Sequence, residues 1–307
     1  MRKIFFKTLE DIARKDKSIF LLVADLGIKF FESFRSVDKE RAINVGVAEA
    51  NMVGVAAGLS LLGKNVYCYS IIPFIALRAL EQIKVDIAFN NLNVKLLGAG
   101  GGLVYGVEGI THHSIEDIAI MRAIPNMTVV CPGDAKEVEC LAKESVSFKG
   151  PMYIRFGRDS ECLIHKGEID FKIGKGIIIN EGKDICLIAT GTMLNCASQV
   201  VEALKEKGLN PTLISMHTIK PMDVDLVKQC AKKYSSIFTL EEHSIIGGLG
   251  GAAAEILAES GYSGKFKRIG IIDKYSHDIG GPSYLLEKAG LDAKSVTDKI
   301  LKELELK

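Results

Sequence analysis

The sequence predicts an α/β protein of two consecutive domains, each with a mainly parallel sheet flanked by helices. Apolar runs of strand length alternate with helical patterns along most of the 307 residues. The alternation lapses into a charged connection at about residues 160–175 and then begins again. A chain of this length is long enough to form two hydrophobic cores. We therefore expect one domain over residues 1–165, a linker over 166–180 and a second domain over 181–307.

Each expected element follows from its hydrophobic period, which is two residues in a strand and 3.6 in a helix. In the first domain, strands are expected at 18–24, 43–47, 65–69, 94–98, 127–130 and 152–156. Helices are expected there at 9–15, 49–62, 76–89, 114–124 and 135–147. In the second domain, strands are expected at 185–190, 211–215, 236–241 and 267–272, and helices at 193–207, 223–232, 248–260 and 283–289.

Composition excludes several classes of function. The net charge of +1 gives no sign of a surface for nucleic acid or membrane. The sequence has no apolar run of membrane-spanning length, and its first residues form a charged amphipathic helix without the apolar core of a signal peptide. Its seven cysteines are odd in number and scattered, which is typical of reduced cysteines in a cytoplasmic protein.

Glu49 is the one ionisable side chain in the stretch AINVGVAEANMVGVAAGLSLLG, residues 42–63. Alternating β-branched residues predict a strand before it and helical spacing predicts a helix from it, so Glu49 lies at a strand-to-helix junction. An exposed carboxylate there would be stabilised by the helix dipole by about 0.3–1 kcal/mol. The Gly and Ala residues around it also leave room for a flat ligand against the carboxyl group. The residues alone leave both uses open.

Two adjacent histidines follow a glycine-rich loop in GVEGITHHSIED, residues 106–117. The imidazole of His112 can donate to an oxygen in one step and carry a proton in another. A metal site is the alternative. However, neighbours in sequence point in different directions and no further ligand cluster is nearby, so we expect no metal ligands in this chain.

Single residues at strand ends are further candidates. Asp25 follows the strand IFLLVA, Phe74 follows YSIIP, and Arg155 and Arg158 end the strand in YIRFGR. Asp at a strand end is usually a turn residue and Phe is usually in the core. Each arginine suits a phosphate but can equally pair with a carboxylate at a subunit interface.

Two glycine-rich segments resemble phosphate loops only weakly. Residues 248–253, GLGGAA, fit a GxGxxA dinucleotide fingerprint, but no acid follows at the position expected for the ribose. Residues 98–105, GAGGGLVY, fit neither that pattern nor the P-loop, and we interpret them as a flexible wall of the active site. For His243, a structural role and contact with a neighbouring subunit's active site are both open.

These motifs resemble the transketolase family, specifically the C-terminal section of split, two-subunit, thiamine-diphosphate-dependent transketolases. The similarity covers nearly the whole chain and is strongest at 42–63 and 106–134, which include NVGVAE, GVEGITHHSIED and MRAIPNM. It implies a thiamine-diphosphate pyrimidine-binding domain followed by a transketolase C-terminal domain. It also implies that Glu49 hydrogen-bonds the cofactor's aminopyrimidine and drives it to the imino form, whose nitrogen removes the thiazolium proton. An apolar, desolvated setting helps a carboxyl group to hold the proton that this requires.

The resemblance also assigns Asp25, Tyr69, Phe74 and Arg78 to the cofactor site. Asp25 belongs to an A-D-L-G segment at the interface between cofactor and domain. Phe74 is the first choice for the aromatic that stacks on the pyrimidine, with Tyr69 or Ile75 as alternatives.

The same resemblance makes His112 a catalytic residue that contacts substrate oxygens. It places Glu108 and His113 beside the substrate, and Arg158 or, second, Arg155 at its phosphate or other anionic end. Glu108 stands where the family usually has Asp, and His113 where it usually has Gln. Together with differences at 28–30 and 98–105, these departures suggest a specialised sugar or sugar phosphate.

A partner is implied because the G-D-G…N segment, which holds magnesium and the diphosphate in this family, does not occur in the sequence. We expect a partner of the N-terminal section to supply it, in an α2β2 heterotetramer. The implied reaction transfers a two-carbon ketol unit from a ketose to an aldose. Two alternatives stay open: a decarboxylating relative, such as a deoxyxylulose phosphate synthase or a 2-oxo-acid dehydrogenase beta subunit, and a non-catalytic partner subunit.

Overall fold

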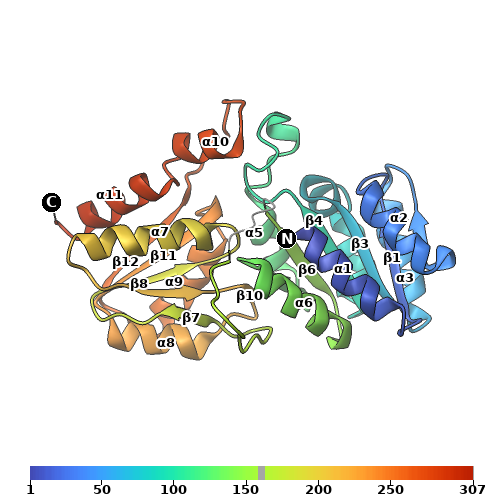
Figure 1. Ribbon diagram of the computed structural model, residues 1–307, viewed down its shortest axis with the longest axis horizontal. Coiled ribbons are helices and arrows are strands. Elements are labelled where there is room, and N and C mark those ends of the chain that lie inside the picture. The colour runs from blue at the N-terminus through green and yellow to red at the C-terminus, as the bar shows by residue number, and fades with distance from the viewer. Residues whose placement is uncertain (158–162, 307) are drawn as a thin grey trace.

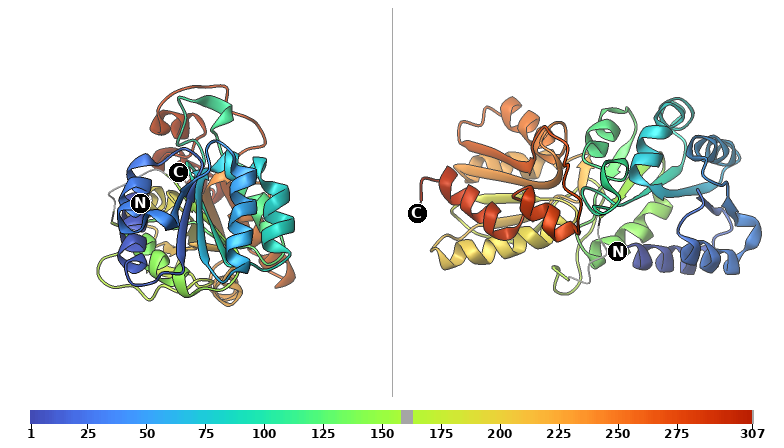
Figure 2. Two further views of the ribbon diagram at one scale, coloured as in Figure 1. Left: turned by 90° about the vertical axis from the view of Figure 1, so that its right-hand side faces the viewer. Right: turned by 90° about the horizontal axis from the view of Figure 1, so that it is seen from above.

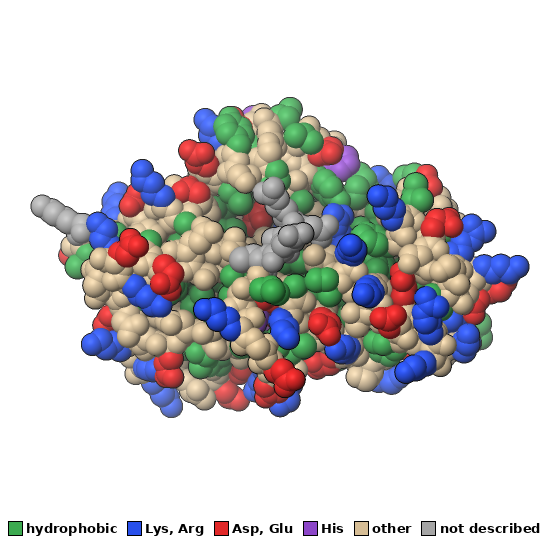
Figure 3. Space-filling model, in the orientation of Figure 1, with side chains coloured by type: hydrophobic (Ala, Val, Ile, Leu, Met, Phe, Trp, Pro, Cys, Tyr) green, Lys and Arg blue, Asp and Glu red, His purple; other side chains and the backbone are tan. Residues whose placement is uncertain are grey.

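The computed structural model describes residues 1–157 and 163–306, and it confirms the predicted α/β class. Figure 1 shows two sheets side by side along the long axis, with the N-terminal half in blue and green and the C-terminal half in yellow to red. Lysines, arginines and acidic residues are interspersed over the face in Figure 3, without a large patch of one sign. In the part of the chain that is described, no helix has both the length and the apolar character needed to cross a membrane.

The first sheet has seven strands in the order β10-β5-β6-β4-β3-β1-β2, all parallel to their neighbours except β10. The strands are β1 (Ile19–Val23), β2 (Ala42–Asn44), β3 (Asn65–Ile71), β4 (Val94–Ala99), β5 (Thr128–Val130), β6 (Met152–Phe156) and β10 (Thr218–Lys220). β10 comes from the C-terminal half and pairs antiparallel with β5. It therefore ties the two halves together through backbone hydrogen bonds.

Helices cover both faces of this sheet because strand side chains alternate between faces. Leu22, Cys68 and Leu96 face one core with α3, and Leu21 and Tyr67 face another with α1 and α6. The helices of this half are α1 (Arg2–Ala13), α2 (Ile28–Val37), α3 (Glu49–Leu61), α4 (Leu80–Gln82), α5 (Asp117–Ala123) and α6 (Ala135–Ser147). Two 3-10 turns, η1 (Lys39–Arg41) and η4 (Gly109–Thr111), and two π-helical turns, η2 (Pro73–Arg78) and η3 (Ile83–Ala88), complete it.

The second sheet has the order β12-β11-β8-β9-β7, parallel except for β7. Its strands are β7 (Ile177–Asn180), β8 (Cys186–Ala189), β9 (Thr212–Ser215), β11 (Ser236–Ser244) and β12 (Lys265–Ile271). Its helices are α7 (Met193–Glu206), α8 (Val224–Lys233), α9 (Leu249–Glu259), α10 (Pro282–Lys288) and α11 (Ala293–Glu303). Figures 1 and 2 show these helices on both faces of the sheet.

The structure differs from the sequence prediction at a few elements. α2, β7, β10 and α11 were not expected, and the strand expected at 43–47 ends at Asn44, just before Gly46 turns with φ +76°. The helix expected at 76–89 starts earlier and is largely π-helical. β7 and β10 are short and pair antiparallel with partners distant in sequence, so no local period marks them.

A buried cluster fixes the segment that joins the two halves. Glu137 on α6 accepts hydrogen bonds from the ring Nε2 of His165 at 2.8 Å and from the Ser215 hydroxyl at 2.5 Å. The carboxylate of Asp134 accepts from the backbone N–H groups of Ile164 and His165, at 3.0 and 3.1 Å. Burial disfavours charge on both members of the Glu137–His165 pair. Their mutual hydrogen bond nevertheless raises the pKa of His165 and, with the charge of His217, lowers the pKa of Glu137.

His165→Gln is expected to lower the free energy of unfolding by about 1.5–3 kcal/mol at pH 6 and by much less at pH 9. Because the pKa of His165 is raised in the folded state, protonation of His165 stabilises the protein fully below its unfolded pKa of about 6.5. This stabilisation is lost as the pH rises through the folded-state pKa. The contribution of Glu137, whose folded pKa is lowered, falls away only at acid pH and is constant across this window. Urea unfolding of both proteins at the two pH values measures the difference. An equal gap at both would contradict a charged His165.

Candidate active site

Glu49 is the first residue of α3 and its side chain is fully buried. Its Oε1 accepts a hydrogen bond from the Ser70 hydroxyl at 2.8 Å, and its Oε2 is paired with Nη1 of Arg78 at 2.5 Å. Ser70 lies near the end of β3 and Arg78 ends η2. The carboxyl group is therefore held inside the protein between strand and helix, which excludes a solvent-exposed acid at a helix start.

Phe74 lies on η2 and is half-buried, whereas Ile75 and Tyr69, the alternatives for the stacking position, are buried in the cores. The guanidinium carbon of Arg78 lies over the Phe74 ring at 4.6 Å from its centroid. The ring of His112 meets Phe74 edge-on, with centroids 5.2 Å apart. Phe74 therefore presents its ring between the Glu49 pair and His112.

Glu49 and Phe74 fit the pyrimidine of thiamine diphosphate. Here a planar cation, the Arg78 guanidinium, lies over the Phe74 ring and donates to the Glu49 carboxylate at the same time. An aminopyrimidine is also planar and offers nitrogens that hydrogen-bond a carboxyl group, so it would meet the same two groups. The Arg78 side chain is 46% exposed and can therefore move aside without unfolding the core.

The two adjacent histidines have different surroundings. His112 is half-buried, bonds the Thr111 hydroxyl through Nδ1 at 2.9 Å, and meets the rings of Phe74 and Tyr105 edge-on. His113 is 3% exposed and lines a cavity of about 460 Å³ against the C-terminal half. Burial lowers the pKa of His113. The contact of His113 with the substrate stays a prediction.

Glu108 is exposed and precedes η4, three residues before Thr111. Its place on the same short loop as His112 keeps it at the rim of the site. Among the residues that the structure describes, no group of three or more His, Cys, Asp and Glu side chains is placed to hold a metal ion.

Arg155 does not face a substrate, which corrects its assignment as the second choice for an anionic group. Its guanidinium is 4% exposed, pairs with Asp117 at 2.8 Å, and donates to the carbonyls of Ser114 and Glu242. These contacts bridge the two halves of the chain. Arg158, the first choice, lies outside the described residues.

Tyr69 faces away from Glu49, whereas the assignment of Asp25 to the cofactor site stays a prediction. Side chains alternate along β3, and because Ser70 points to Glu49, Tyr69 points to the other face. There its ring meets Phe6 edge-on at 5.1 Å in the second core, which corrects the expectation that it contacts the cofactor. Asp25 has φ 54° and exchanges hydrogen bonds with Asn44 in an exposed turn. This geometry agrees with the interpretation of Asp25 as a turn residue.

The glycine-rich loop at residues 98–105 is anchored and not free. Gly102 pairs with Ser114 through two backbone hydrogen bonds, and the N–H groups of Gly100 and Gly101 both donate to the Phe156 carbonyl. The buried carboxylate of Glu242 accepts from the Leu103 N–H at 2.8 Å. The interpretation of a flexible wall is therefore corrected.

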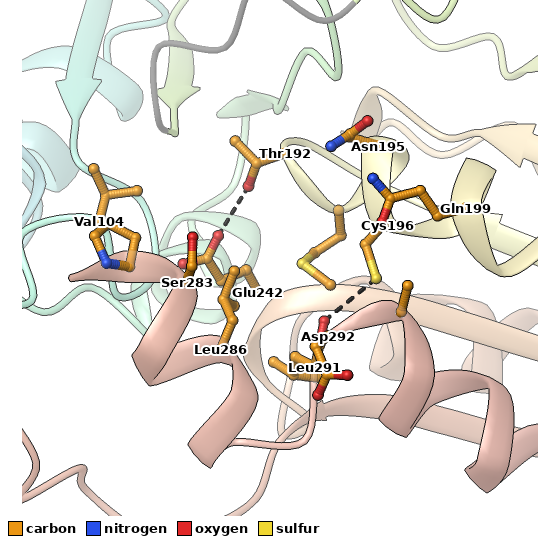
Figure 4. Close-up of a pocket in the computed structure, with 13 residues that line it drawn as sticks. Val104, Thr192, Asn195, Cys196, Gln199, Glu242, Ser283, Leu286, Leu291 and Asp292 are labelled. Atoms are coloured by element: carbon orange, nitrogen blue, oxygen red, sulfur yellow. Dashed lines mark hydrogen bonds between the residues drawn. The ribbon is translucent and has the colours of Figure 1, made fainter. Parts of the chain in front are cut away.

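Glu242 was not recognised from the sequence, because no local pattern marks it. Its other oxygen accepts from the hydroxyl of Thr192 at 2.9 Å, as the dashed line in Figure 4 shows. Figure 4 also shows Val104 at the edge of a cavity of about 490 Å³ whose other lining residues belong to the C-terminal half. Ser70 was not predicted for a related reason. Only its hydrogen bond to Glu49, which is distant in sequence, shows that it belongs to the site.

The glycine-rich turn at the start of α9 is occupied by the protein's own acid. Oε2 and Oε1 of Glu241 accept from the N–H groups of Leu249 and Gly250, at 2.7 and 2.8 Å. A Cβ at Gly248 would lie 2.0 Å from that carboxylate. Burial raises the pKa of Glu241 to about 7. The weak dinucleotide fingerprint therefore marks an internal hydrogen-bonded cap, and the buried His243 lies beside it in the structure.

Comparison with known proteins identifies this architecture. The family model for the transketolase pyrimidine binding domain matches residues 1–161, and the model for the transketolase C-terminal domain matches residues 174–296. These domains define the class of the chain, a family that depends on thiamine diphosphate. The chain belongs to the transketolase family and is its C-terminal section, a transketolase-type transferase subunit.

Individual relatives align with this chain over nearly their full lengths. A chain of Methanocaldococcus jannaschii, provisionally named as a transketolase C-terminal section, is 40% identical over 99% of this chain and 96% of its own. The 6-deoxy-6-sulfo-D-fructose transketolase subunit SqwH of a Clostridium species (strain MSTE9) is 38% identical over 96% and 92%. A solved split-gene transketolase, described as an inactive beta4 tetramer, superposes with TM-score 0.88 at 36% identity, covering 100% and 98%.

Proposed function

We propose that this chain assembles with an N-terminal-section partner as an α2β2 heterotetramer that transfers a two-carbon ketol unit from a ketose to an aldose. The observation that carries the proposal is the buried Glu49 carboxyl group beside the ring of Phe74, where Arg78 meets both. A solved relative with this chain's domains is described as an inactive tetramer of one subunit, which supports the need for a partner.

Within the assembly, each residue of this chain has a proposed part. With Arg78 displaced, Glu49 would hold the pyrimidine of the cofactor through a hydrogen bond and could exchange a proton with it, and Phe74 would support the ring. His112 donates to a sugar oxygen and carries a proton between steps. Thiamine diphosphate supplies the carbon nucleophile that accepts the ketol unit, and the partner holds its diphosphate and magnesium. We retain Arg158 as the proposed contact for an anionic end of the sugar.

The sugar is proposed to be a specialised one. Glu108 on the rim, together with residues 28–30 and 98–105, departs from the common family pattern. One relative is named for a sulfonated ketose, 6-deoxy-6-sulfo-D-fructose, and this supports the proposal of a specialised sugar.

The proposal is tested by reconstitution. We expect this chain to co-purify with a transketolase N-terminal section and the pair, with thiamine diphosphate and magnesium, to transfer ketol units between sugars. A screen of donors and acceptors should favour a substrate other than the common xylulose and ribose phosphates. Full activity of this chain alone would refute the need for a partner, and carbon dioxide release from pyruvate would indicate the decarboxylating alternative.

A further inference from the structure

The ring of His112 meets two aromatic rings edge-on. Phe74, which Arg78 links to Glu49, lies 5.2 Å from His112, and the ring of Tyr105 lies 6.0 Å from it. Glu49 and Phe74 belong to the proposed cofactor contact. Tyr105 therefore lies beside the side chain proposed to contact the sugar.

The glycine-rich loop fixes Tyr105 in that place. A Cβ at Gly100 would lie 2.2 Å from the Tyr105 ring, and Gly100 has φ +88°, which glycine adopts at least cost. Cβ atoms at Gly101 and Gly102 would lie 2.6 and 2.4 Å from Arg155 and Glu242. These glycines let the backbone approach three large side chains, so Tyr105 is presented by a loop packed on the protein.

The hydroxyl group of Tyr105 is also fixed. It accepts a hydrogen bond from Nη1 of Arg2 on α1 at 3.1 Å, and the same nitrogen lies 3.3 Å from the Tyr69 hydroxyl. Both edges of the Tyr105 ring are thus held, one by the Gly100 backbone and one by Arg2. The contact of the ring with the Gly100 backbone does not depend on the hydroxyl group, so the ring keeps its place without it.

We propose that Tyr105 is a specificity-determining residue, which closes the sugar site beside His112 and limits the length of the aldose acceptor. The inference rests on the proposed ketol transfer. A pocket that loses or gains the space of a few carbon atoms typically changes discrimination by about 10- to 200-fold. The ring, and not its hydroxyl, supplies the barrier.

The test uses the reconstituted complex with one ketose donor and unphosphorylated aldose acceptors of two to five carbons. In Tyr105→Ala, the ratio of kcat/KM for the five-carbon acceptor to that for the three-carbon acceptor should rise about tenfold or more. Tyr105→Phe keeps the ring and should leave the ratio within about twofold of the wild type. Val104→Ala truncates the neighbour that faces the cavity of Figure 4, and it should also leave the ratio unchanged.

Two results would overturn the inference. One is an equal fall for all acceptors in Tyr105→Ala, which would mean that the ring only supports the loop or His112. The other is the same change of ratio in Val104→Ala as in Tyr105→Ala, which would assign the effect to the loop. The donor half-reaction of the wild type is measured first, and its absence would refute the proposed function instead.

Discussion

Glu49→Gln is expected to lower kcat of the reconstituted enzyme by about 10²- to 10⁴-fold, the usual contribution of a positioned proton donor or acceptor. Gln keeps the shape of the side chain and can still accept a hydrogen bond from Ser70 or Arg78, but it cannot exchange a proton with the pyrimidine. The fold should therefore survive. Steady-state kinetics with saturating thiamine diphosphate measures the loss.

The control for Glu49→Gln is Glu202→Gln on α7, which removes an exposed glutamate that pairs with Lys205 on its own helix. It should retain wild-type kcat. Analytical size exclusion of each variant with the partner separates a catalytic defect from a failure to assemble. If Glu49→Gln kept more than about a tenth of kcat in an intact complex, Glu49 would be a structural acid and the proposed mechanism would fail at its first step.

The position of Glu49 illustrates what local sequence can predict. A strand period that ends and a helical period that begins place it at a junction, and the small residues around it predict space for a ligand. Both are properties of neighbours along the chain. Burial of the carboxyl group depends in addition on Ser70 and Arg78, which β3 and η2 bring from 21 and 29 residues away.

Arg155 illustrates where sequence reasoning fails. An arginine at a strand end next to a predicted active site suits a phosphate. The sequence cannot reveal that its guanidinium instead pairs with the carboxylate of Asp117, 38 residues away. The contact depends on how α5 packs against β6 and on how the two halves meet. For Tyr69, by contrast, the alternation of side chains along β3 was visible in the sequence. Only the contact between Ser70 and Glu49 shows which face of the sheet carries the site, and therefore that Tyr69 lies on the other face.

Asp117→Asn is expected to lower the free energy of unfolding by about 3–5 kcal/mol, the cost of breaking a buried ion pair by removing one partner. Asp117 and the Arg155 guanidinium are both buried, and the hydroxyl of Tyr153 donates to the same carboxylate oxygen at 2.7 Å. Asn removes the carboxylate charge that pairs directly with the guanidinium in a desolvated place. Urea unfolding of the chain at neutral pH measures the change.

The double variant Asp117→Asn/Arg155→Met separates charge from packing. Met fills much of the volume of the arginine stem and carries no charge, so the double variant should be more stable than Asp117→Asn alone. If the double variant lost as much free energy of unfolding as the two single variants lose together, the two residues would stabilise the protein through independent contacts instead.

The pair is also expected to matter for the active site, because Arg155 donates to the carbonyls of Ser114 and Glu242. Ser114 follows the two histidines and pairs with Gly102 of the glycine-rich loop, while Glu242 holds Leu103 of that loop. Loosening the pair should therefore increase hydrogen exchange at residues 100–115 before it does so in the centres of the sheets. Uniform exchange across the chain in Asp117→Asn would instead indicate a global loss of stability with no special link to the site.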